Sequence, residues 1–182
     1  MDTFTSTTSA DPANGETEQV NTPSGAPAQV SSSTGLIENL VNSATPPAGT
    51  TPPQGVSFDD GYFSFDITGL TVGGSTTVTI TLPAGSAPDS YYKVQNGSFF
   101  EFLFDGTDGA QINGNVITLT LVDGGRGDAD GVANGVIVDP GAPGTSSTTT
   151  TVRANGGGAF NPLLLMVMLL FAGLRLRGRK AS

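Results

Sequence analysis

Five oxygen-bearing side chains recur in one glycine-rich stretch, DGGRGDADGVANGVIVDPG, at residues 123–141. They are Asp123, Asp128, Asp130, Asn134 and Asp139. Carboxylate and amide oxygens are the hard ligands that Ca²⁺ prefers, and small residues between them allow the backbone to curl around an ion. The stretch is therefore a candidate Ca²⁺ site with these five residues as ligands. Asp and Gly also favour tight turns, so a turn-rich loop without metal is the alternative interpretation.

Part of this stretch, DADGVAN, resembles the calcium loops of thrombospondin type 3 repeats and EF-hands. The match is incomplete, because Arg126 stands where an Asp-x-Asp-x-Asp-Gly pattern has its first acidic ligand. Ile137 stands where an EF-hand loop has its closing Glu. Arg126, Gly127 and Asp128 also spell the tripeptide that integrins bind, a three-residue match that fits an Asp/Gly turn equally well.

Two common catalytic side chains are missing from the sequence, which has no His and no Cys, and it has no Trp. This removes the usual general base, thiol nucleophiles and Cys/His zinc sites. Asp59 and Asp60 form an acidic pair, but no second carboxylate cluster accompanies them, and we expect solvated turn residues. Tyr91, Tyr92 and Phe99 would suit a sugar-binding platform, although aromatic residues are also common in strands. We expect a protein that is not an enzyme.

The charges of the chain are separated along its length. The formal net charge is −9, and all 16 acidic residues lie at or before Asp139. Four of the seven basic residues lie at the C-terminal end: Arg175, Arg177, Arg179 and Lys180. An acidic body repels phosphates, so we expect no nucleic-acid partner. Such a surface suits a hydrated extracellular domain.

Alternating apolar and polar residues predict strands between about residues 56 and 140. The predicted inward-facing residues are Phe63, Phe65, Ile67, Val78, Ile80, Leu82, Phe100, Phe102, Phe104, Ile117, Leu119 and Leu121. SYYKVQ is a weaker candidate strand, and Asn-Gly and Asp-Gly pairs mark turns between the strands. We predict an all-β fold, a small antiparallel β-sandwich over residues 55–141, with one modest core.

The segments on either side of this region are rich in Ser, Thr, Pro and Gly. Residues 1–54 are predicted to be a disordered linker, because apolar residues are too sparse to offset the entropy of ordering the chain. Within it, Leu36, Ile37, Leu40 and Val41 have helical spacing and predict a transient helix. Residues 142–158 are predicted to be a second flexible linker. Met1 is not followed by a signal peptide, so we expect a C-terminal piece of a longer protein or a misplaced start.

The C-terminal segment, residues 159–182, combines an apolar run with the basic cluster described above. The uncharged run comprises Pro162, Leu163, Leu164, Leu165, Met166, Val167, Met168, Leu169, Leu170, Phe171, Ala172, Gly173 and Leu174. As a helix, the 16 uncharged residues from Ala159 would span roughly 24 Å, which is short for a bilayer but manageable if the basic side chains snorkel. We predict a transmembrane helix with the basic end cytoplasmic and the body outside. A buried core helix and a GPI-type signal are the alternatives.

Gly156, Gly157 and Gly158, followed by the apolar run and the Arg cluster, resemble a GlyGly-CTERM sorting tail. The resemblance implies that a rhomboid-like protease, rhombosortase, cuts near these glycines after the tail has held the protein in the bacterial inner membrane. The protein then passes to the cell surface or is secreted. The FDITGLTVGGSTTVTITLPAG, YYKVQNGSFFEF and ITLTLVDGGRGDADGVANGVIVDPGAPG segments resemble the choice-of-anchor U domain, which precedes varied anchoring signals in bacterial surface proteins. That resemblance implies a location and an architecture, and no catalytic residue.

These observations lead to three hypotheses. The first is a non-enzymatic surface-anchoring and sorting region, in which the sandwich is a spacer ahead of a processed membrane tail. The second is a Ca²⁺-dependent adhesive or carbohydrate-binding module, whose ligand the sequence does not identify. The third, an enzyme that uses carboxylates, has the least support because no catalytic cluster can be assigned.

Overall fold

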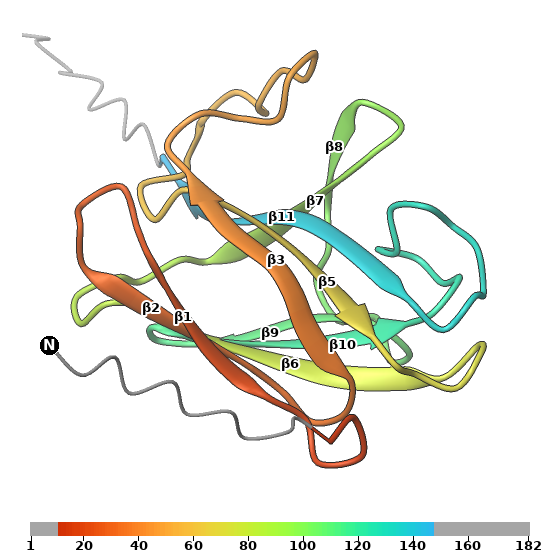
Figure 1. Ribbon diagram of the computed structural model, residues 1–182. Helices are drawn as coiled ribbons and strands as arrows, with labels where there is room; N and C mark the ends of the chain where they lie inside the picture. The colour runs from red at the N-terminus through yellow and green to blue at the C-terminus, as the bar shows by residue number, and fades with distance from the viewer. Residues whose placement is uncertain (1–10, 148–182) are drawn as a thin grey trace, which may run out of the picture. The chain divides into compact units, whose positions relative to one another are not determined.

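The computed structural model describes residues 11–147, which form two antiparallel β-sheets packed face to face (Figure 1). The predicted C-terminal helix, residues 159–182, and most of the second linker lie outside the described residues. Within residues 11–147, no helix is long and apolar enough to cross a membrane. The prediction of an all-β sandwich with antiparallel strands is confirmed for this part of the chain.

The first sheet, called sheet I, has five strands in the order β1-β2-β6-β10-β9. Its strands are β1 (Thr17–Asn21), β2 (Pro27–Ser32), β6 (Ser75–Thr81), β9 (Gly109–Asn113) and β10 (Val116–Val122). The predicted alternation of β6 and β10 is confirmed, because Val78, Ile80, Ile117 and Leu119 are fully buried. The two strands pair antiparallel, with Ile80 opposite Ile117 and Val78 opposite Leu119.

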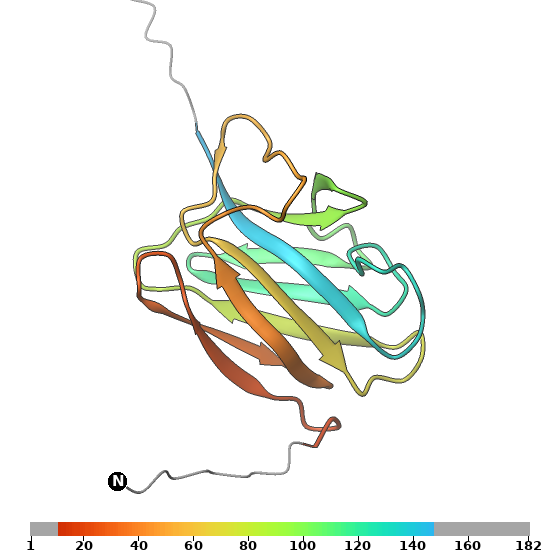
Figure 2. The same cartoon turned by 45° about the horizontal axis from the view of Figure 1, so that its top comes forward.

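The second sheet, called sheet II, has six strands, five of them in the order β3-β5-β11-β7-β8. Its strands are β3 (Leu36–Ser43), β4 (Val56–Ser57), β5 (Tyr62–Thr68), β7 (Ser90–Gln95), β8 (Ser98–Glu101) and β11 (Ile137–Ser146), and β4 pairs with the end of β11. Two residues, Asn96 and Gly97, join β7 to β8, and both have positive φ angles, as a type I′ hairpin turn requires. Figure 2 shows the sheet II strands lying over the strands of sheet I.

The core lies between the sheets and uses inward residues of both. It includes Val30, Ile37, Phe63, Phe65, Ile67, Val78, Ile80, Tyr91, Phe102, Ile117, Leu119, Leu121 and Ile137. Of the three phenylalanines predicted to share one face in the SFFEFLF segment, Phe102 is fully buried and Phe100 packs against the core. Phe104, which lies beyond the end of β8, is 40% exposed.

The prediction of a disordered linker over residues 1–54 is wrong for residues 17–43, which form β1, β2 and β3. β2 pairs with β6 and completes sheet I, where Ala28 and Val30 are fully buried. Small and β-branched residues are sufficient here, since a strand contributes only alternate side chains to the core. Composition alone therefore underestimated the ability of residues 17–43 to form strands.

The transient helix predicted around Leu36 is also wrong, because this segment is strand β3, paired with β5. The register between the two strands shifts by one residue between Glu38 and Val41, which is a β-bulge, and Asn39 has a φ of 54°. The extra residue moves the next inward side chain from the second to the third position after Ile37. This shift produces the i, i+3 spacing that resembles a helical period.

The predicted boundary at residue 141 is wrong as well, because β11 continues to Ser146 through the first residues of the expected second linker. β11 contains Pro140, Gly141, Pro143 and Gly144, which rarely occur in a central strand. Gly141 is required by packing: a Cβ there would lie 2.5 Å from the hydroxyl oxygen of Tyr91. Because of these Pro and Gly residues, the sequence pattern did not indicate a strand here.

The first and the last described residues lie at opposite ends of the sandwich (Figures 1 and 2). The carbonyl of Pro12 accepts a hydrogen bond from Gly35, and Pro12 lies beside Gly69, which follows the last residue of β5. Ser146 pairs with Val56 at the other end, where β5 begins. The described part of the chain thus runs from one end of the sandwich to the other.

Candidate functional site

The five predicted Ca²⁺ ligands lie in or beside the loop between β10 and β11, but their side chains have different partners. Asp123 is buried, and its Oδ2 accepts hydrogen bonds from the amides of Gly73 (2.7 Å) and Gly135 (2.8 Å). Its Oδ1 accepts a hydrogen bond from the amide of Asn134 at 3.1 Å. Burial alone would raise the pKa of this carboxyl, but the backbone amides that it accepts from lower the pKa below its ordinary value. Asp123 therefore links the turn before β6 to the loop between β10 and β11 through hydrogen bonds.

Asp128 is buried and has a similar role within the loop. Its Oδ2 accepts a hydrogen bond from the amide of Gly124 at 2.8 Å, and its Oδ1 accepts one from the amide of Val138 at 3.0 Å. The integrin-type tripeptide is consequently not displayed, because its Asp is only 1% exposed. Its Arg126 contacts Asp108 at 2.8 Å and Asp105 at 3.2 Å, and its guanidinium lies against the ring of Phe102.

Asp130 and Asn134 are exposed at the tip of the loop. Asp130 accepts hydrogen bonds from the amide of Val132 and from the side-chain amide of Asn134. Asn134 in turn accepts one from the amide of Val136. These are local bonds of the kind that Asp and Asn make in turns.

The structure does not bring the predicted ligands together around one point. Within residues 11–147, no group of three or more acidic residues is placed so that it could hold a metal ion. The oxygens of Asp123 and Asp128 already accept backbone hydrogen bonds, and Asp139 is paired with a lysine. In this structure these oxygens serve as acceptors for the loop backbone and for Lys93, and a Ca²⁺ site at the five residues stays a prediction.

The fifth residue, Asp139, belongs to a buried site that sequence analysis missed. Its Oδ2 lies 2.6 Å from Nζ of Lys93, and both side chains are 0% exposed. Lys93 also donates a hydrogen bond to the carbonyl of Gly127 at 2.7 Å, and its Nζ lies 5.1 Å from the centre of the Phe102 ring. Tyr91, two residues before Lys93 on β7, is also fully buried.

Strand periodicity brings Lys93 and Asp139 to the same face of sheet II. Lys93 lies opposite Gly141 in the register of β7 and β11, and Asp139 is two residues before Gly141 on β11. The pair is therefore a diagonal cross-strand pair, within reach of a long side chain. The signal was present in the sequence, because Tyr91 and Lys93 alternate in SYYKVQ and Ile137 and Asp139 alternate in GVIVDPG.

Burial perturbs all three polar groups of this site. It lowers the pKa of Lys93, against the opposing effect of the Asp139 carboxylate. Burial also raises the pKa of Asp139, opposed by Lys93. The pKa of Tyr91 rises well above its ordinary value, first through burial and then through the charge of Asp139. Each shift favours the neutral form of its group, as desolvation requires.

The other candidates from the sequence lie on the surface of the sandwich. Tyr92 and Phe99 join Phe58 and Tyr62 in a half-buried cluster of four aromatic rings, with centroids 5.2–6.1 Å apart. Tyr91 is not part of that platform, because it points into the core. Asp60 accepts a hydrogen bond from the hydroxyl of Ser86, as a solvated turn residue can.

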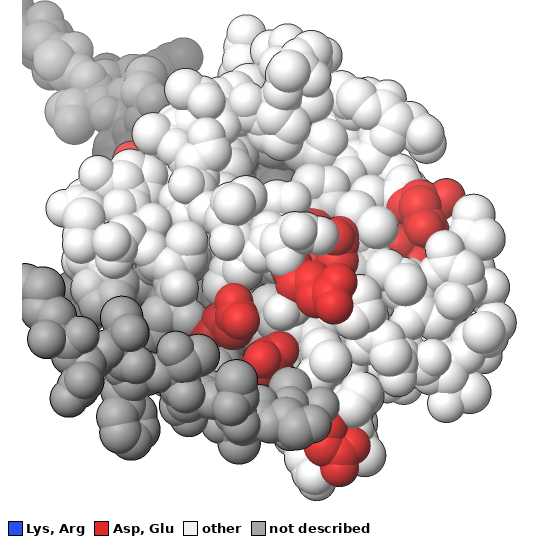
Figure 3. Space-filling view, in the orientation of Figure 1, with Lys and Arg blue, Asp and Glu red and all other residues white. Residues whose placement is uncertain are grey.

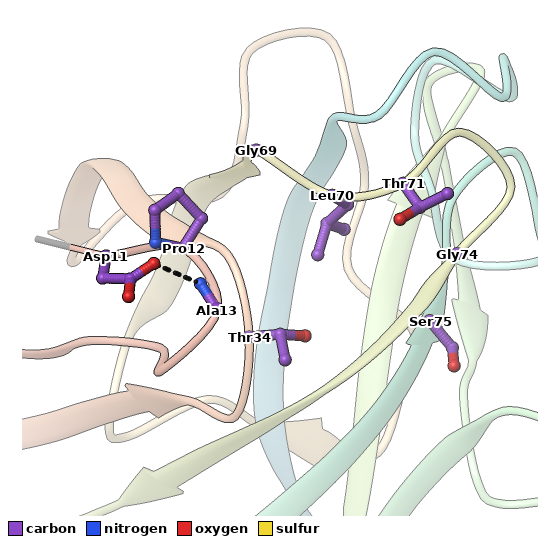
Figure 4. A pocket seen from close by; sticks show the side chains of 9 residues that line it. All are labelled: Asp11, Pro12, Ala13, Thr34, Gly69, Leu70, Thr71, Gly74 and Ser75. Atoms are coloured by element: carbon purple, nitrogen blue, oxygen red, sulfur yellow. Dashed lines mark hydrogen bonds between the residues drawn. The ribbon is translucent and has the colours of Figure 1, made fainter.

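One hollow on the described surface is an open depression of about 600 Å³ beside the turn after β5 (Figure 4). It is lined by Asp11, Pro12, Ala13, Thr34, Gly69, Leu70, Thr71, Gly74 and Ser75. Its one carboxylate, Asp11, accepts hydrogen bonds from Ala13 and Asn14 within its own turn. The depression offers no set of converging polar groups.

The surface charge of the sandwich is acidic. Of the 16 acidic residues only Asp2 lies outside the described part, which holds two basic residues, Lys93 and Arg126. Both are engaged with carboxylates. The face in Figure 3 accordingly shows acidic side chains with no basic ones among them.

Comparisons of the chain with protein-family models, curated proteins and solved structures give no match.

Proposed function

We propose that the chain is the non-enzymatic C-terminal anchoring and sorting region of an exported bacterial protein. The observation that carries the proposal is that the described part of the chain begins at one end of the sandwich and finishes at the other. The last strand of the described residues, β11, has 10 residues and extends about 33 Å at roughly 3.3 Å per residue. A domain with its ends so placed holds its N-terminal and C-terminal neighbours apart, which is the property of a spacer.

The surface chemistry is consistent with a spacer in a hydrated compartment. Lys93 and Arg126 are both engaged with carboxylates, so the sandwich presents mainly negative charge to its surroundings. Like charges keep such a domain soluble and away from anionic lipids and nucleic acids. The carboxylates of the β10–β11 loop hold backbone amides, which supports a structural role for them.

In this proposal the tail supplies attachment and release. The uncharged run Pro162–Leu174 crosses the inner membrane, and Arg175, Arg177, Arg179 and Lys180 stay on the cytoplasmic side. The sandwich is then outside, and a rhomboid-like sorting protease cuts near Gly156–Gly158 to pass the protein to the cell surface.

Topology can be tested by cysteine labelling, because the sequence has no Cys of its own. The full chain is expressed behind an export signal with either Gln54→Cys or Ser182→Cys, and spheroplasts are treated with a membrane-impermeant maleimide. We expect labelling of the exposed position 54 at once, and of position 182 only after permeabilisation. Labelling of both positions in intact spheroplasts would refute a membrane-spanning tail.

Processing is tested separately, by co-expressing a rhomboid-like sorting protease. We expect release of the body from the membrane fraction, and retention when Gly156, Gly157 and Gly158 are all replaced by Val. Release of the triple variant at the normal rate would show that the protease does not need the glycines. The labelling result would still decide whether the tail spans the membrane.

A second candidate function, a carbohydrate-binding module, is favoured by the cluster of Phe58, Tyr62, Tyr92 and Phe99 on sheet II. Aromatic rings that are half-exposed can stack on sugar rings. The full chain would be screened on a glycan array beside Tyr92→Ala, with and without a chelator. Binding that is lost in the variant would support the module, and loss on chelation would add Ca²⁺ dependence.

A further inference from the structure

The buried contact between Lys93 and Asp139 has the geometry of a reactant pair. Nζ lies 2.6 Å from Oδ2, and Cγ is one bond of about 1.23 Å beyond that oxygen. The amine nitrogen is therefore within about 3.9 Å of the carboxyl carbon, close to the roughly 3–3.5 Å of productive encounters. The two sheet ladders that border β11 hold the backbones of both residues in place.

The surroundings do not compensate a charged pair well. Among the described residues, Lys93 has one further hydrogen-bond partner, the carbonyl of Gly127, and its Nζ also lies over the Phe102 ring. Within the described residues, neither carboxyl oxygen of Asp139 has a partner at hydrogen-bonding angles, and the hydroxyl of Tyr91 has none. Removing two charges from water is costly unless such partners satisfy them. A reaction that eliminates both charges would relieve this cost.

Burial favours the neutral form of the pair. It lowers the pKa of Lys93 and raises the pKa of Asp139, and both shifts favour proton transfer from the ammonium to the carboxylate. The negative charges of Asp128 and Asp108 act in the opposite sense on Lys93, and Asp128 also raises the pKa of Asp139. A neutral amine beside a neutral carboxylic acid is the pair that can condense to an amide.

We propose that Lys93 and Asp139 form an intramolecular isopeptide bond that covalently joins β7 to β11. The lone pair of Nζ attacks Cγ of the protonated carboxyl and forms the N–C bond. The C–OH bond then breaks, and the hydroxyl leaves as water with a proton from the nitrogen. One amide and one water molecule are produced, and no oxidant, reductant or activating group is consumed. Burial keeps water from the amide once it has formed.

Peptide mapping tests the bond directly. Trypsin can cut this chain after Lys93, Arg126 and Arg153 and would release residues 94–126 and 127–153 as separate linear peptides. With the bond, Lys93 is no longer a cleavage site. We expect a branched product in which residues 1–126 are joined to residues 127–153, with a mass lower by one water. The full chain is purified, held at neutral pH, denatured and then digested.

Variants of the two residues distinguish the bond from other reactions. Lys93→Met and Asp139→Ala should abolish the branched product, whereas Asp139→Asn should still form it with loss of ammonia in place of water. Asp66→Asn, a change at a carboxylate outside the pair, should leave the product unchanged. The wild-type map remains decisive if a buried-site variant fails to fold.

Two results would overturn the proposal. One is recovery of free peptides 94–126 and 127–153 at their full masses after prolonged incubation of the folded protein. The other is a loss of water while Lys93 remains cleavable, because Asp-Gly steps such as Asp123-Gly124 can lose water by cyclising locally. The first result would leave a buried ion pair, and the second would place the dehydration elsewhere.

Discussion

Replacing Asp123 with Asn should destabilise the sandwich through three backbone amides at once. The carboxylate accepts hydrogen bonds from Gly73, Asn134 and Gly135 at 2.7–3.1 Å, and these join the turn before β6 to the loop before β11. An amide keeps one oxygen and turns an NH₂ group toward at least one of these donors. Each hydrogen bond to a charged group contributes about 1.5–3 kcal/mol, so we expect a total loss of about 2–4 kcal/mol.

For a domain of this size, such a loss lowers the melting temperature by roughly 6–15 °C. The assay is thermal unfolding of the full chain, followed by circular dichroism at neutral pH. Asp130→Asn in the same loop is the matched control, because Asp130 is exposed and its bonds are local. We expect the control to change stability by no more than about 0.5 kcal/mol.

The pH dependence gives a second readout of the Asp123 prediction. Because folding lowers the pKa of Asp123, its contribution is fully present above the unfolded-state pKa and is lost as the pH falls through the folded-state pKa. The stability gap between the wild type and Asp123→Asn should therefore be largest at neutral pH and shrink in acid. A melting temperature within roughly 2 °C of the wild type, or a gap that persists in acid, would refute the reasoning.

Three further predictions concern the fold and the loop. Deleting residues 1–34 removes β1 and β2, uncovers β6 and should abolish cooperative unfolding in a thermal melt, whereas loss of a mere linker would leave the melt unchanged. Gly141→Ala places a Cβ 2.5–2.8 Å from three atoms of the Tyr91 side chain and should cost about 1–3 kcal/mol in a denaturant titration; a wild-type midpoint would contradict this packing. Millimolar Ca²⁺ should leave the melting temperature unchanged, because Asp123 and Asp128 already hold backbone amides, and a clear rise would restore the calcium site.

Strict alternation of large apolar residues made three strands predictable from the sequence. β5, β6 and β10 bury Phe63, Phe65, Val78, Ile80 and their neighbours at every second position, as the period-two pattern indicates. The β1–β2 hairpin was not predicted because the residues it buries are small, such as Ala28, and its exposed positions are mostly polar, such as Thr17, Gln19 and Gln29. Its place in the sheet is decided by pairing with β6, a long-range contact that local composition does not carry.

The site was only half predictable, for a related reason. Asp139 was identified as a functional residue, but with its loop neighbours as partners, because they are close to it in the sequence. Its actual partner, Lys93, is distant in the sequence and is brought to it by the pairing of β7 with β11. Since β11 contains two prolines and two glycines, nothing in its local pattern indicated a strand that could make this pairing.

The position of β11 determines how the domain would respond to mechanical load. β11 is hydrogen-bonded to β5 along its first half and to β7 along its second, and it is the last strand in the described part of the chain. A pull on the chain beyond Ser146 acts along the strand axis, so the ladder hydrogen bonds must rupture together in shear and cannot open one after another. The sandwich would therefore transmit tension between its two ends while keeping its core closed.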